Sequence, residues 1–272
     1  MLQHFHLTGK QAAVIMLVIS LVLMLALVTA AKAAPQANTY IVGGTNDPTP
    51  GACTPIVGGG YSCPSLRSAV IAANANPGST IRLSHGVTYT LSIAPSGNDD
   101  AATGDLNLTA DTTFNFGNVL CMSNCAAIIQ GGADWHDRIL NIAVGAHVDG
   151  FLITIRNGHV TGADGGGILN NGTLSLSNGT IVSNTTNLWG GGGIQNYGTL
   201  LLTDTLILSN TANYGGGLGS GNPNFYTKTA TLNNCQIVGN QSINQGGGIY
   251  NFGTLAINGG TISNNSAKQS GS

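Results

Sequence analysis

Four copies of a glycine-led repeat fill the stretch between Asp164 and Asn265. Three of them read GGGILNNGTLSL, GGGIQNYGTLLL and GGGIYNFGTLAI, and the third in chain order is a degenerate GGGLGSG. The apolar residue after each run of glycines recurs after 26, 24 and 31 residues, at Ile168, Ile194, Leu218 and Ile249. Repeats of this length are typical of solenoids, in which each unit forms one coil of the chain.

Residues within a unit alternate between apolar and polar, as Leu174 and Leu176 do among threonine and serine. This period of two predicts short, half-buried strands. Glycines and Asn-Gly pairs such as Asn171-Gly172 separate the strands, since both residue types tolerate the positive φ of a turn, and their frequency excludes a helix. The repeats therefore predict an all-β fold, a parallel β-helix with three short strands per coil and like residues stacked about 4.8 Å apart.

Each unit closes with the pattern I-x-x-N. The isoleucines are expected to face the core, and the asparagines to form a hydrogen-bonded ladder that satisfies buried turn carbonyls. The ladder residues are Asn184, Asn210, Asn240 and Asn265. Cys235 falls in the column of Gly179, where we expect a small packed residue.

The composition narrows the possible functions. The chain has 272 residues and no glutamate, and only 7% of its residues are charged. A helical or α/β enzyme of this length would rarely lack glutamate. The net charge of −2, without any basic patch, argues against a nucleic-acid partner. No sequence motif predicts a cofactor.

Residues 1–33 have the features of a secretory signal peptide. Lys10 precedes a long apolar run, and Ala31-Lys32-Ala33 has the small-x-small form of a cleavage site. The run is about twenty residues long, so an uncleaved membrane anchor is the alternative. We expect a secreted or cell-surface protein with no other membrane contact.

Export to an oxidising compartment permits disulfides. Cys53 and Cys63 flank a loop rich in glycine, and Cys121 and Cys125 enclose three residues, so we predict that each pair is bridged. Zinc would need four converging cysteine or histidine ligands, and the sequence places no histidine beside Cys121 and Cys125. No metal site is predicted.

Residues 34–80 predict an N-terminal cap. After Pro64 and Ser65, apolar residues fall on one face of a helix that Asn76-Pro77-Gly78 ends. A short amphipathic helix there would cover the open end of the solenoid. Residues 81–162 are expected to form irregular coils, and residues 163–272 the four repeats.

The string CPSLRSAVIAANANPG resembles the CSLREA motif of secreted bacterial and archaeal β-helix proteins, which is followed in that family by repeats of the form GGGIYNxGTL. Pro64 is inserted after the cysteine, and Ser68 stands where the family has glutamate. The repeats are also similar to those of chlamydial polymorphic outer membrane proteins, here as GGGI and IxxN. The resemblance implies a right-handed, pectin-lyase-like parallel β-helix that acts as a structural or adhesive surface module.

The alternative is a polysaccharide lyase or glycoside hydrolase of the same fold. Such enzymes need carboxylates that project together, and Asp204 is the only acidic residue after Gly165. The remaining catalytic candidates are Asp137 and His159, in a stretch rich in aspartate and histidine, although solvated surface positions are the simpler interpretation. Calcium candidates are Asp99, Asp100 and Asp105, for which a plain Asx-rich turn is preferred.

Aromatic residues suggest a binding role. Trp189 and Tyr214 each precede a run of glycines, and Tyr197 and Phe252 each follow a repeated asparagine. Aromatic faces on a rigid surface can hold sugar rings or a partner protein. We expect an extracellular polysaccharide or a cell-surface protein as the partner, with ordinary surface packing as the alternative.

The chain ends where a further run of glycines would begin, with no capping element. We expect a longer repeat array cut short, or a minimal edge guarded by Lys268. An uncapped coil would favour end-to-end self-association.

Overall fold

The structure is a computed structural model, and it describes residues 36–97, 100–117, 121, 124–221 and 228–268. The chain separates into two units, Met1–Gln36 and Ala37–Ser272. The predicted signal peptide, residues 1–33, lies outside the described residues. In the part of the chain that the structure describes, no helix is long and apolar enough to cross a membrane.

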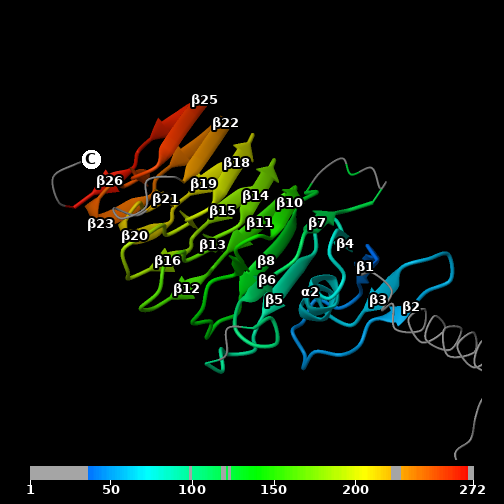
Figure 1. Cartoon of the computed structure of the whole chain (residues 1–272). Helices are drawn as coiled ribbons and strands as arrows, with labels where there is room; N and C mark the ends of the chain where they lie inside the picture. The colour runs from blue at the N-terminus through cyan, green and yellow to red at the C-terminus, as the bar shows by residue number, and fades with distance from the viewer. Residues whose placement is uncertain (1–35, 98–99, 118–120, 122–123, 222–227, 269–272) are drawn as a thin grey trace, which may run out of the picture. The chain divides into compact units, whose positions relative to one another are not determined.

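The unit that begins at Ala37 is all-β apart from one short helix among its described residues, and nearly all strand pairs are parallel (Figure 1). The largest sheet has the order β2-β3-β1-β4-β7-β10-β14-β18-β22-β19-β15-β11-β8-β5, with β25 paired to β22. Its strands are β1 (Thr39–Val42), β2 (Thr54–Pro55), β3 (Tyr61–Cys63), β4 (Ser79–Arg82), β5 (Thr88–Leu91), β7 (Thr112–Asn115), β8 (Ala127–Gly131), β10 (His147–Phe151), β11 (Ile153–Arg156), β14 (Thr173–Ser177), β15 (Thr180–Val182), β18 (Thr199–Thr203), β19 (Leu206–Leu208), β22 (Thr229–Val238) and β25 (Thr254–Ser263).

Two smaller parallel sheets complete the stack. One has the order β12-β16-β20-β23-β26 and the other β24-β21-β17-β13-β9-β6. Their strands are β12 (His159–Val160), β16 (Thr185–Thr186), β20 (Thr211–Tyr214), β23 (Gln241–Gln245) and β26 (Ser266–Ala267), then β6 (Leu106–Leu108), β9 (Leu140–Ile142), β13 (Ile168–Asn170), β17 (Ile194–Asn196), β21 (Leu218–Ser220) and β24 (Ile249–Asn251).

Every repeat contributes a strand to each of the three sheets, in register with the repeats on either side. Ile168 pairs with Ile194, Ile194 with Leu218, and Leu218 with Ile249. This arrangement of long parallel sheets is compatible with the predicted β-solenoid. The first two repeats have four short strands rather than the predicted three, since β14 and β15, and likewise β18 and β19, are separate where β22 and β25 are continuous.

The inward side chains form a continuous apolar core. Ile181, Ile207 and Ile237 stack in register on one wall and are almost fully buried. Cys235 is buried and occupies the column of Gly179, since the neighbouring residues Thr180, Leu206 and Gln236 pair in register. Burial raises the pKa of its thiol, so this cysteine is a small packed residue, as predicted.

The asparagine ladder lies at the turn after these isoleucines. The side-chain Nδ2 of Asn184 donates to Oδ1 of Asn210 at 3.0 Å, and the same bond joins Asn210 to Asn240 at 3.0 Å and Asn240 to Asn265 at 2.9 Å. Each Oδ1 also accepts the backbone N–H of the preceding asparagine, and each Nδ2 also donates to a buried isoleucine carbonyl. The I-x-x-N pattern therefore predicts the ladder of amides correctly, but the carbonyls that it satisfies belong to isoleucines within strands and not to the turns.

The helix α2 (Leu66–Asn74) begins after Ser65, whose hydroxyl accepts the backbone N–H of Ser68, as the sequence predicts. Arg67, in the first turn of this helix, is fully buried. Its guanidinium donates two hydrogen bonds to Asp47, at 2.7 and 2.8 Å, and further bonds to backbone carbonyls including that of Gly104. This buried pair ties the helix to the loops around it. The sequence analysis missed β1, β2 and β3, which extend the large sheet beyond β4.

Both predicted cysteine pairs are disulfides. Cys53 is bridged to Cys63 and Cys121 to Cys125. Cys63 is buried at the end of β3, so the first bridge fastens the loop after Cys53 to the large sheet.

Asn210→Ala should lower the free energy of unfolding by about 2 to 4 kcal/mol, because it removes the side-chain acceptor of the buried Asn184 N–H and the side-chain donor to the Ile181 carbonyl. Urea denaturation measures the change. Asn213→Ala is the matched control, since the Asn213 amide makes an exposed bond outside the ladder. An equal loss in both variants would contradict a special role for the ladder.

Replacing Cys53 and Cys63 together by alanine should lower the free energy of unfolding by about 2 to 3 kcal/mol, because the bridge closes a short loop in the unfolded chain. Thermal melting with and without reductant measures the effect. The reductant should lower the melting temperature of the parent chain more than that of the double variant. Identical responses would count against this contribution.

Candidate binding cleft

The in-register coils place outward side chains in columns that run from coil to coil. One column contains Leu169, Gln195, Gly219 and Tyr250, and the next outward column contains Asn171, Tyr197, Gly221 and Phe252. In both columns the third coil has glycine where its neighbours have large side chains. The degenerate third repeat therefore keeps the backbone pairing and removes one layer of side chains.

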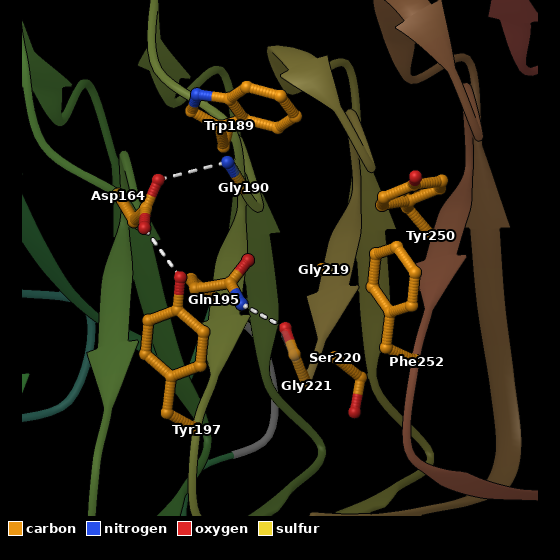
Figure 2. A pocket seen from close by; sticks show the side chains of 10 residues that line it. All are labelled: Asp164, Trp189, Gly190, Gln195, Tyr197, Gly219, Ser220, Gly221, Tyr250 and Phe252. Atoms are coloured by element: carbon orange, nitrogen blue, oxygen red, sulfur yellow. Dashed lines mark hydrogen bonds between the residues drawn. The ribbon is translucent and has the colours of Figure 1, made fainter. Parts of the chain in front are cut away.

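A cleft of about 300 Å³ lies at this gap. Figure 2 shows Tyr250 and Phe252 on one side, Gln195 and Tyr197 on the other, and the glycines of the third coil between them. The lining residues are Asp164, Trp189, Gly190, Gln195, Tyr197, Gly219, Ser220, Gly221, Tyr250 and Phe252. Three consecutive coils and the turn before β13 thus contribute to one concave surface.

A chain of aromatic contacts runs along the rim of the cleft. The rings of Trp189 and Tyr214 are stacked with centroids 5.1 Å apart and planes 3° from parallel. Tyr214 lies 5.0 Å from Tyr250, which meets Phe252 edge to face at 4.8 Å. Trp189 is 64% exposed, so much of its surface is open to a ligand. Such rings offer large, rigid apolar surfaces for contact.

Asp164 organises the polar side of the cleft. Its Oδ2 accepts a hydrogen bond from the Tyr197 hydroxyl at 2.5 Å, and its Oδ1 accepts the backbone N–H of Gly190 at 3.0 Å. Burial, followed by the bond to Asp164, raises the pKa of Tyr197 far above its ordinary value. The phenol therefore stays protonated and keeps donating to the carboxylate.

Gln195 forms the floor. It is only 2% exposed, and its Nε2 donates to the carbonyl of Gly221 at 3.2 Å. Its Oε1 lies beside Gly190 and Gly219, where an added Cβ on either glycine would sit 2.0 Å from it. Among the described residues, this oxygen has no hydrogen-bond partner. This oxygen is itself buried, enclosed between the second and third coils.

Three of the four predicted aromatic residues line the cleft: Trp189, Tyr197 and Phe252. The fourth, Tyr214, supports Trp189 and Tyr250 from outside the lining. The sequence analysis missed Tyr250 as a site residue, although it stands two positions before Phe252 and so lies on the same strand face. Gln195 was not predicted either, because its position depends on Gly219 in the next coil, which leaves room for the Gln195 amide.

The predicted catalytic candidates lie elsewhere and are occupied by structural contacts. The two carboxylate oxygens of Asp137 accept the backbone N–H groups of Asp105 at 2.9 Å and Arg138 at 2.8 Å. His159 is exposed and is joined to Asp137 by a backbone bond, with its ring 5.7 Å from that of His136. This geometry gives Asp137 a role in holding the loop, and a catalytic role stays a prediction without support.

The two calcium candidates that the structure describes, Asp100 and Asp105, make separate structural contacts. Asp105 is buried and pairs with Arg138 at 3.2 Å, whereas Asp100 caps an exposed turn by accepting the N–H of Ala102. Asp99 lies outside the described residues.

The premise that no histidine lies near Cys121 and Cys125 is wrong. The fold brings a nitrogen of His85 and both sulfurs within 4.8 Å of one another. The sequence could not reveal this, because His85 is separated from the cysteines by a whole coil. In the disulfide the two sulfurs are bonded to each other, so they are not thiolate ligands.

Asp137→Asn should lower the free energy of unfolding by about 1 to 2 kcal/mol, because the amide retains one acceptor for two backbone N–H groups. Ligand binding at the cleft should be unchanged, since Asp137 is not among its lining residues. Urea denaturation and binding assays check both parts. Polysaccharide cleavage by the parent chain that the variant loses would contradict this structural role.

Comparisons with protein-family models, with curated proteins and with solved structures found no significant match to this chain.

Proposed function

We propose that this chain is an exported, right-handed parallel β-helix of the CSLREA type that acts as a non-catalytic surface module and binds polysaccharide at the cleft. The in-register parallel sheets and the N-terminal helix support this fold. The right-handed form is favoured because connections between parallel strands of one sheet are right-handed in nearly all proteins.

The observation that carries the binding role is the continuous aromatic rim beside a concave cleft. Trp189, Tyr214, Tyr250 and Phe252 make successive ring contacts at 4.8 to 5.1 Å. Apolar walls with a few convergent polar groups are typical of ligand sites. Sugars suit such walls because one face of a pyranose is apolar while its hydroxyls reach outward to polar groups.

Export is supported by the two disulfides, which persist in oxidising compartments. In this proposal residues 1–33 direct secretion, either as a cleaved signal peptide or as a retained anchor. A secreted or cell-surface location would give the cleft access to extracellular polysaccharide.

The composition of the cleft favours binding over hydrolysis. Asp164 is the single carboxylate among its lining residues, whereas glycoside hydrolysis ordinarily uses two carboxyl groups on either side of the scissile bond. Asp164 is also held by Tyr197 and Gly190. The lyase or hydrolase alternative is left with Asp137 and His159, outside the cleft.

A glycan array on the purified protein, read for both retained ligand and shortened products, tests the proposal. We expect retention without cleavage, and Trp189→Ala should weaken it by about 3- to 10-fold through the loss of ring stacking. Phe151→Ala is the matched control, because Phe151 is an exposed aromatic residue on β10 that does not line the cleft.

Equal losses in the two variants would overturn the assignment of binding to the cleft. Shortened products would overturn the non-catalytic role, and retention of no glycan would overturn polysaccharide binding.

A further inference from the structure

We propose that the cleft accepts a non-anionic pyranose ring and that Asp164 excludes uronate rings. This inference rests on the proposed polysaccharide binding and specifies the class of sugar. It is carried by the aromatic walls of the cleft, by the acceptor that Asp164 offers and by the charge of the lining.

The walls of the cleft offer apolar ring faces to a ligand. Tyr250 and Phe252 line one side and Tyr197 the other, with the backbone of the third coil between them. The amide of Gln195 packs over Gly219 and fills the position above that glycine. The apolar face of a pyranose ring can pack against these aromatic rings.

The polar groups of the cleft require a ligand that donates hydrogen bonds. The carboxylate of Asp164 is an acceptor, and the Tyr197 hydroxyl already donates its hydrogen bond to it. Oε1 of Gln195 is buried, so a ligand does not reach it. Sugar hydroxyls can donate to the Asp164 carboxylate, but a ligand carboxylate offers only further acceptors.

The negative charge of Asp164 also favours a ligand without a carboxylate. Asp164 is the one charged residue among the ten that line the cleft, and no lysine or arginine is present there to neutralise a ligand carboxylate. A uronate bound beside Asp164 would bring two negative charges together in a partly buried place, where water screens them less than at an open surface. The cleft should therefore discriminate against acidic polysaccharides.

Matched oligosaccharides test this inference on the full-length protein. We would use gluco, galacto and manno backbones, each in a neutral form and in a form oxidised to the carboxylate at C6, and measure Kd by calorimetry. At least one neutral member should bind, and its uronate counterpart should bind at least about 10-fold more weakly.

Asp164→Asn isolates the charge, because asparagine retains the shape and an acceptor for Gly190. It should reduce the preference for the neutral form by at least about threefold. Asp204→Asn is the matched control, since it removes the same charge from an exposed turn that does not line the cleft. It should leave the preference unchanged.

The failures are distinguishable. Binding of uronates as tight as that of neutral forms would overturn this inference and leave polysaccharide binding intact, whereas binding of no oligosaccharide would overturn both. A preference that Asp164→Asn does not reduce, or that Asp204→Asn reduces equally, would overturn the role of Asp164.

Discussion

The buried asparagine ladder is the interaction on which the order of the repeats depends. Each ladder amide bonds the next coil, accepts a backbone N–H and donates to the carbonyl of a strand isoleucine, so it satisfies several buried polar groups at one point. Because each bond requires the neighbouring asparagine at the same height, the ladder holds adjacent coils in one register. The stacked isoleucines then follow as the core.

Because the register is fixed, the loss of two side chains in the third repeat leaves a cleft at a defined place on the surface. The third repeat loses its outward side chains at Gly219 and Gly221, yet Leu218 still pairs with Ile194 and Ile249. Backbone hydrogen bonds do not depend on those side chains, so the coil keeps its place while a cleft opens above it. Within one strand, Leu218 is therefore buried in the core while Gly219 lines the cleft.

Sequence reasoning succeeded where the pattern was local or repeated. It predicted α2 from its cap and its apolar face, the ladder from I-x-x-N, and both cysteine pairs from their spacing and the inferred export. It failed to predict contacts between side chains that are far apart in the sequence and do not belong to the repeats. His85 beside Cys121 and Cys125, and the burial of Arg67 against Asp47, join residues with no shared pattern.

The amino-acid sequence by itself determined which residues form strands and which of them face the core, because alternation and repetition are properties of neighbouring residues. The tertiary structure decided which outward residues meet. Trp189 and Tyr214 precede equivalent runs of glycines, so the sequence already placed them in adjacent coils, but it did not predict that Tyr214 lies 5.0 Å from Tyr250. Such contacts depend on how each coil bends to keep the common register, and that bending is set by the packing of the whole stack.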